Sequence, residues 1–157
     1  VYESFTVVIM VEDFFMRRIL QAGKAVVVAL LVILCAVFAL CLSRAPVFEQ
    51  GEGYELSYGQ SSSAKTERTE TPFLDKLIHG TVAGESVRYR GDRYEKLKAQ
   101  FSAELLFTEE SNGVVNYYLY SPRIAGGVQL YGKTVNLHIA VGSEQTAVGT
   151  PLIFGGF

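Results

Sequence analysis

Residues 25–43 read AVVVALLVILCAVFALCLS and contain no charged side chain. An α-helix rises about 1.5 Å per residue, so this run matches the roughly 30 Å hydrocarbon core of a bilayer. The run decides the architecture, because the chain that follows it has ordinary globular composition and, at about 110 residues, is long enough to bury a core. We therefore predict a transmembrane or signal helix at 25–43 and one domain at 44–157.

Positive charge lies on the N-terminal side of the run. Arg17, Arg18 and Lys24 precede it, and Arg44 alone follows it closely. The positive-inside rule then places the N-terminus in the cytoplasm and the domain outside, across a bacterial cell membrane that is crossed once.

Residues 1–15, which precede Met16, look unlike the N-terminus of a translated protein. Residues 1–24 form the cytoplasmic n-region, and Met16-Arg17-Arg18 is a typical beginning for one. We expect that translation begins at Met16 and that residues 1–15 are not translated. N-terminal sequencing that finds Val1 would contradict this expectation.

The apolar run is either kept as a membrane anchor or removed as a signal sequence. It is longer than the about 7–15 residues of a cleaved signal, which favours an uncleaved anchor. Cleavage after Ser43, where Cys41-Leu42-Ser43 offers small residues, would instead release a secreted domain. Cys35 and Cys41 are the chain's two cysteines, so the domain has no disulfide framework and no cysteine-based metal site.

The charge of the chain argues against nucleic acid as a partner. The formal net charge is −2, and the three basic and three acidic residues before Arg44 cancel, so the −2 belongs to the domain. A protein that neutralises DNA phosphates shows a basic footprint. Arg88, Arg90 and Arg93 are the one local group of basic residues that keeps DNA binding as a remote alternative.

The domain reads as alternating short strands and helices after a linker at 44–53. Pro72 suits the start of a helix that Gly80 ends, and Asp92 with Glu95 has the form of a capping box. Tyr94, Leu97, Phe101 and Leu105 would form the apolar face of this second helix. Strands are predicted at 54–58, 64–71, 81–90, 114–121, 135–141 and 147–154, and helices at 73–79 and 92–105.

This order, β-β-α-β-α-β-β-β, predicts an α+β fold: a mostly antiparallel sheet with helices packed on one face. Val135, Leu137, Ile139 and Val141 alternate with polar or small residues, as in a half-buried strand. Pro151 suggests an edge position or a bulge for the last strand.

Gly127–Thr134 satisfies the phosphate-binding pattern G-x-x-x-x-G-K-[ST]. That loop requires a helix after its Thr, whose N-terminus points at the phosphates. Here VNLHIAV follows, which alternates as a strand. We interpret the match as a β-hairpin that turns at Tyr131-Gly132-Lys133, and predict neither nucleotide nor any other cofactor.

A recognition surface is predicted on the sheet face away from the helices. If Tyr117, Leu119, Leu137 and Ile139 face the core, one set of polar and aromatic side chains shares the other face. Tyr offers contact area together with a hydroxyl, which suits binding. The candidate binding residues are Asn116, Tyr118, Tyr120, Asn136 and His138.

No catalytic or metal-ligating constellation emerges from the sequence. His79 and His138 have no cluster of further ligands around them, and a metal site needs three or four. The enzymatic alternative is an exported wall-acting hydrolase that uses Glu109 or Glu110 with His138. It requires a cleft that joins these side chains.

The C-terminal residues carry a family resemblance. Val135-Asn136-Leu137-His138-Ile139-Ala140, followed by Val148-Gly149-Thr150-Pro151-Leu152-Ile153 and a terminal aromatic, resembles the YwmB-like family of Firmicutes. The resemblance covers residues 80–157 and implies a fold like that of the TATA-box-binding protein. Longer members have two related halves, so this shorter chain would hold a half or reduced version, with its first part compressed into residues 50–79.

That resemblance implies an anchor or signal segment, an extracytoplasmic location, spore-forming hosts and no established enzyme activity. The leading hypothesis is therefore a non-enzymatic, membrane-anchored domain of the bacterial cell envelope. It would bind an envelope protein or a cell-wall component during sporulation or wall remodelling, with residues 25–43 in the membrane.

Overall fold

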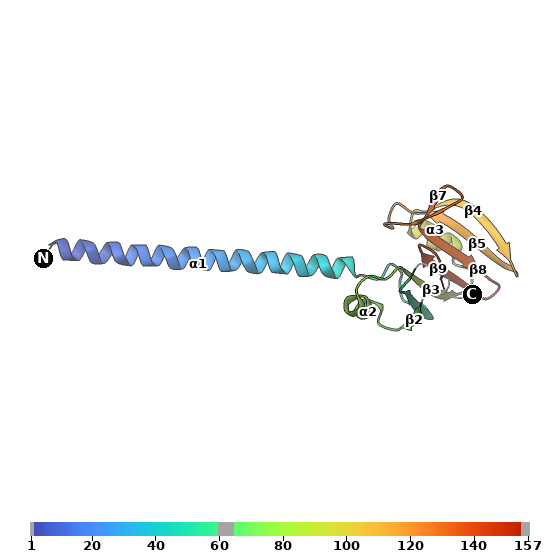
Figure 1. Ribbon diagram of the computed structural model, residues 1–157, viewed down its shortest axis with the longest axis horizontal. Helices are drawn as coiled ribbons and strands as arrows, with labels where there is room; N and C mark the ends of the chain where they lie inside the picture. Colours follow the sequence, from blue (N-terminus) through green and yellow to red (C-terminus); the bar gives the residue numbers. More distant parts are fainter. Residues whose placement is uncertain (1, 60–64, 155–157) are drawn as a thin grey trace. The chain divides into compact units, whose positions relative to one another are not determined.

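The computed structural model describes residues 2–59 and 65–154 and divides into two compact units, residues 1–43 and 44–157 (Figure 1). Helix α1, Tyr2–Ser43, makes up the first unit. Its part Arg18–Ser43 has 26 residues, none of them buried, and is long and apolar enough to cross a membrane. This exposed apolar helix is of the kind found in signal sequences and membrane anchors.

The second unit is built on a seven-stranded antiparallel sheet with the order β2-β1-β3-β9-β8-β5-β4. Strands β6 and β7 pair separately as a hairpin. The α+β fold class predicted from the sequence is thereby confirmed. The strands are β1 Gly53–Ser57, β2 Thr66–Thr69, β3 Gly84–Arg90, β4 Glu104–Ser111, β5 Val114–Tyr120, β6 Val128–Leu130, β7 Lys133–Val135, β8 Leu137–Val141 and β9 Gln145–Thr150, and the short helices are α2 Pro72–His79 and α3 Tyr94–Gln100.

Both short helices cover the same side of the sheet, here called the core face. Directly opposed residues of neighbouring strands point to one side, and one such row on the core face is Val87, Val148, Ile139 and Tyr117. From α3, Leu97 packs into this core, and the ring of Tyr94 stacks on that of Tyr117 at 3.9 Å between centroids. From α2, the buried Lys76 reaches Glu85 of β3.

The second helix is shorter than the sequence pattern suggested. Tyr94 N donates to Asp92 Oδ1 at 2.8 Å, but the N-cap residue is Arg93, which makes no side-chain capping bond, so the predicted capping box of Asp92 and Glu95 is wrong. The helix ends at Gln100, and Ser102 turns the chain with a φ of 49°. Leu105, expected on the helix, lies instead in strand β4 and is 38% exposed.

Strands β8 and β9 lie inside the sheet and are buried on both faces. Every residue from Val135 to Ala140 is buried, so the predicted half-buried strand is wrong. Strand β9 lies between β3 and β8, and it ends before Pro151 without being an edge.

The C-terminal residues 151–154 cover part of the second side of the sheet, here called the outer face. A Cβ on Gly149 would lie 2.8 Å from Leu152 O and 2.9 Å from Ile153 Cγ1, so only glycine admits this close approach. The terminal aromatic Phe157 of the family resemblance lies outside the described residues.

The segment that follows α1 belongs to the domain. Residues 44–53 were expected to be a linker, but Phe48 is only 4% exposed and its ring meets that of Phe101 at 5.6 Å. Tyr89 Oη donates to Glu49 O at 2.7 Å, and Glu52 N donates to Arg88 O at 2.9 Å. The ordered domain therefore begins almost directly after the apolar helix.

The pattern Gly127–Thr134 forms the β6–β7 hairpin, as predicted. Its turn is Tyr131-Gly132, with φ angles of 49° and 75°. Lys133 Nζ donates to Leu106 O at 3.1 Å. A strand follows the Thr, so the backbone has no helix N-terminus to present to a phosphate.

Candidate binding surface

Three rings stand in a row across strands β4, β5 and β8 on the outer face, and we call them the aromatic ladder: Phe107, Tyr118 and His138. The centroids of Phe107 and Tyr118 are 4.5 Å apart at an interplanar angle of 18°, and those of Tyr118 and His138 are 4.5 Å apart at 11°. Neighbouring strands are about 4.8 Å apart, so each ring stands upright on its own strand and fills the space to the next. Phe107 and Tyr118 therefore offer their ring edges to solvent, His138 is buried, and the ring faces are occupied by one another.

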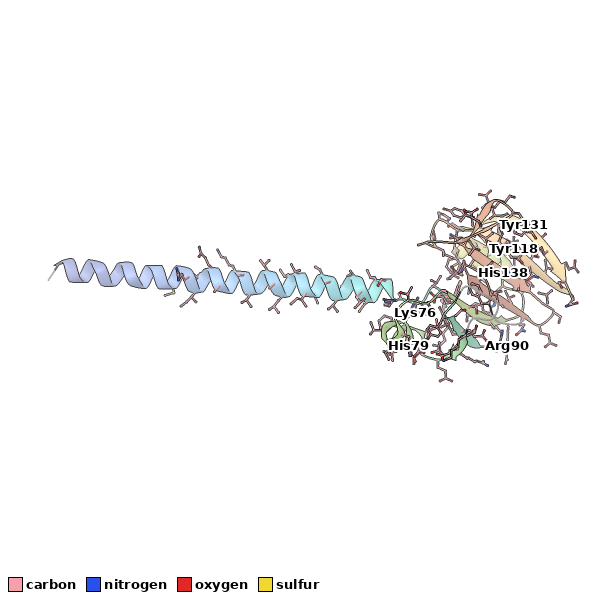
Figure 2. All side chains as sticks on the ribbon, viewed as in Figure 1. Lys76, His79, Arg90, Tyr118, Tyr131 and His138 are labelled. Atoms are coloured by element: carbon pink, nitrogen blue, oxygen red, sulfur yellow. The ribbon has the colours of Figure 1, made fainter. Side chains whose placement is uncertain are left out.

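Both ends of the ladder are closed by other groups. Tyr131, at the tip of the β6–β7 hairpin, places its ring edge-on to Phe107 at 5.4 Å. At the other end, Gly149 lies opposite His138 in β9, and Ile153 of the C-terminal segment occupies the space above it. Figure 2 shows Tyr131, Tyr118 and His138 following one another across the domain.

Glu109 links the ladder to the hairpin. Its Oε2 accepts a hydrogen bond from Tyr118 Oη at 3.0 Å, and its Oε1 accepts one from Tyr131 Oη at 3.3 Å. Burial and the hydrogen bond to this carboxylate raise the pKa of Tyr118 to about 12, so the phenol remains a donor at physiological pH. Tyr131 is 82% exposed. The result is a carboxylate held between two phenols, one of which, Tyr131, has a largely exposed ring.

His138 is fixed as a neutral imidazole. The amide of Ile153 donates to His138 Nδ1 at 3.3 Å, so the proton lies on Nε2, which donates to Asn116 Oδ1 at 3.0 Å. Burial lowers the pKa of His138 to about 4. The ring therefore supports the ladder as a neutral group and has both nitrogens engaged.

The structure brings together three of the five binding residues predicted from the sequence. Asn116, Tyr118 and His138 form one hydrogen-bonded and stacked group on the outer face. Tyr120 lies further along β5, opposite Glu104, and is 41% exposed. Asn136 lies elsewhere: it is fully buried, and its amide bonds to Ser121 N, Ser121 O and Ile124 O, which fixes the loop after β5.

The ladder and its hairpin contain residues that the sequence reading missed. Phe107 was not assigned to the surface because β4 was not recognised as a strand, and Tyr131 was assigned only to a hairpin turn. The signal that could have found Phe107 is the run Phe107-Thr108-Glu109, which alternates before the turn at Asn112-Gly113. The register shift between Leu105 and Phe107 interrupts that alternation at its start.

The residues named for the enzymatic alternative are not brought together as an acid and a base. Glu110 lies opposite Val115, on the other side of the sheet from His138. Glu109 shares the outer face with His138, but the ring of Tyr118 stacks on His138 and its hydroxyl bonds to Glu109. Both ring nitrogens of His138 are hydrogen-bonded within the domain, so neither is free to exchange a proton with a substrate at neutral pH.

The other charged candidates have local partners. Arg88 pairs with Glu55 at 3.3 Å, and Arg90 pairs with Glu52. His79 ends α2 and contacts the ring of Tyr58 edge-on at 5.9 Å. Among the described residues, no group of three or more His, Cys, Asp or Glu side chains is arranged to hold a metal ion.

Comparison of the chain with protein-family models, with curated proteins and with solved structures gives no match. The fold and the surface define an α+β domain that follows an apolar helix and carries an exposed aromatic and acidic cluster. The resemblance to the YwmB-like family stays a prediction.

Proposed function

We propose that this chain is a non-enzymatic binding protein of the bacterial cell envelope, anchored in the cell membrane by its apolar helix. Its domain, from residue 44 onward, lies outside the cytoplasm. It recognises an envelope protein or a cell-wall component through Tyr131, Glu109 and the aromatic ladder.

The anchor and its orientation have separate support. The helix Arg18–Ser43 exceeds the about 20 residues that a bilayer requires. Arg17, Arg18 and Lys24 before the apolar run favour a cytoplasmic N-terminus. The resemblance to the YwmB-like family adds the expectation of a spore-forming host and a role in sporulation or wall remodelling.

One observation carries the binding role: Glu109 is held by two tyrosine hydroxyls beside the exposed ring of Tyr131. Tyrosine gives a large contact area at low cost in conformational entropy. The carboxylate accepts hydrogen bonds, and a ring face attracts cations. The ligand chemistry that fits is an amino group, such as the free amines of a cell-wall peptide or a lysine of an envelope protein.

The test uses the full chain in lipid nanodiscs and soluble cell-wall fragments, intact or with their amino groups acetylated. Saturable binding should be seen with the intact fragments and should fall at least tenfold after acetylation. Tyr131→Ala and Glu109→Gln should each weaken binding by a similar factor, because removal of a hot-spot side chain costs about 2 kcal/mol. Ser143→Ala, at an exposed position in the β8–β9 turn, is the matched control.

Two results would refute the proposal. One is the absence of saturable binding to fragments of either kind. The other is binding that Tyr131→Ala and Glu109→Gln leave at the level of the Ser143→Ala control.

A further inference from the structure

Helix α2 presents its apolar side away from the sheet. Leu74, Leu77 and Ile78 are 50%, 41% and 73% exposed. They have the i, i+3, i+4 spacing of a single helix face. The opposite side, with Pro72 and Lys76, is buried against the domain. A helix on the surface of a soluble domain normally turns its leucines inward, so the outward face of α2 calls for an apolar neighbour.

Hydrogen bonds tie α2 and β3 to the first residues of the domain, those that follow the apolar helix in the chain. Lys76 Nζ donates to Ala45 O at 2.8 Å, and Val47 N donates to Glu85 Oε2 at 3.2 Å. Helix α1 ends at Ser43, so Arg44 is the one residue between the helix and this fixed segment. Covalent geometry limits two residue steps to about 7 Å. Helix α2 is thus held within one lysine side chain of Ala45, which follows the apolar helix by two residues in the chain.

We propose that the exposed face of α2, Leu74, Leu77 and Ile78, inserts into the headgroup region of the membrane that holds α1. The inference rests on the proposed membrane anchor and adds a second, interfacial contact between domain and lipid. Amphipathic helices bury their apolar face about 5–10 Å into the boundary between headgroups and acyl chains. The contact needs no anionic lipid, because α2 has no exposed Lys or Arg and its one lysine is buried.

The membrane anchor strengthens the binding of a helix as short as α2 to the membrane surface. A short apolar helix binds a membrane weakly from solution, but a tethered one meets the surface at high effective concentration. Arg44 suits this geometry, since a long basic side chain at the end of an apolar helix places its charge among the headgroups. The domain is then held against the bilayer on its α2 side and cannot tumble freely on its tether.

The experiment uses the full chain with Cys35→Ala and Cys41→Ala, so that one introduced cysteine carries an environment-sensitive fluorophore. Ile78→Cys reports on α2, and Ser111→Cys reports on the exposed end of β4, the edge strand far from α2. The protein is reconstituted in phosphatidylcholine vesicles that contain lipid with a doxyl quencher near the headgroup. A second vesicle set adds phosphatidylglycerol. Leu74→Glu with Leu77→Glu, both at exposed positions, is combined with the Ile78→Cys reporter.

Lipid contact predicts several-fold stronger quenching at position 78 than at 111, in both vesicle sets, and a loss of most of this difference in the double Glu variant. Near-ultraviolet circular dichroism of the tyrosines checks that this variant is folded. Equal quenching at both positions, in protein that stays in the vesicles after an alkaline wash, overturns the lipid contact and leaves the anchor standing. Disulfide cross-linking between unlabelled Ile78→Cys chains, with no quenching in the labelled protein, overturns it in favour of a second copy. Release of the protein by the wash overturns both proposals.

Discussion

The substitution Lys76→Met tests how the domain is held to the segment that follows the apolar helix. Lys76 Nζ lies 2.7 Å from Glu85 Oε1, and the two side chains are 7% and 5% exposed. Tyr54 Oη and Val47 N donate to the other carboxylate oxygen. Removing the lysine leaves a buried carboxylate without its counter-charge. Removal of one partner of a buried ion pair typically lowers the free energy of unfolding by about 3–5 kcal/mol.

The double variant Lys76→Met with Glu85→Gln separates charge from packing. A glutamine keeps an acceptor for Tyr54 but has no charge to compensate, so the double variant should recover about 2 kcal/mol relative to Lys76→Met alone. Replacing both members of a buried ion pair by neutral groups costs little in general. The remaining loss comes from Ala45 O, which has no lysine donor in either variant.

The assay is urea unfolding of the full chain in micelles, followed by tyrosine circular dichroism in the near ultraviolet. With a slope of about 1–2 kcal/mol/M, Lys76→Met should lower the urea midpoint by roughly 2 M. Lys96→Met, which removes an exposed lysine of α3, is the matched control and should stay within about 0.5 kcal/mol of the parent. A double variant as unstable as Lys76→Met alone would show that the lost free energy is packing and that the charge argument is wrong.

Three further predictions follow from the outer face. Burial lowers the pKa of His138 to about 4, below the unfolded value of about 6.5. The contribution of the neutral ring to the free energy of unfolding, roughly 2–3 kcal/mol, is therefore complete above pH 6.5 and is lost as pH falls towards 4. Urea midpoints of the parent and of His138→Phe should converge over this window, and parallel profiles would contradict the assignment. Gly149→Ala places a Cβ against Leu152 O and should cost about 1–3 kcal/mol, measured as a lower urea midpoint; an unchanged midpoint would mean that the C-terminal segment does not pack there. Glu109→Gln removes the charge beside Tyr118, so the pKa of this phenol, about 12 in the parent, should move towards 10 in an NMR titration of labelled tyrosine, and an unmoved value would leave burial as its whole cause.

The sequence predicted secondary structure correctly where a local pattern reflects one physical requirement of the backbone or of the solvent. Pro72 and Gly80 bound a helix because one suits its first turn and the other takes a φ of 81° after its end. The pattern Gly127–Thr134 was recognisable as a hairpin because alternation continues on both sides of Gly132. The apolar run 25–43 predicted a transmembrane or signal helix because it is the one stretch of nineteen residues in the sequence without a charge, and the structure has a long apolar helix there.

The sequence failed where tertiary position overrides the local pattern. Leu105 has helical spacing from Leu97 and Phe101, yet Ser102 turns the chain and Leu105 begins an edge strand. Asn136 alternates with apolar residues as an exposed side chain would, but its amide is buried because the loop after β5 needs its three hydrogen bonds. Because strand β4 was missing from the prediction, Phe107 was also missed, since a cross-strand ladder exists only once strands are in register.

The order of the strands sets the two proposed contacts at opposite ends of one sheet. Strands β2 and β1 lie at the end near α2, and β4 lies at the other. Six inter-strand steps of about 4.8 Å separate the edge strands by roughly 29 Å, so Glu109 on β4, with Tyr131 bonded to it, is far from the residues of α2 that we propose face lipid. If α2 rests on the membrane, a partner can therefore reach the binding surface without displacing the lipid contact. The two sites should then be separable by mutation: Leu74→Glu with Leu77→Glu should free the domain from lipid and leave ligand affinity in nanodiscs unchanged, because their energies are independent at this distance.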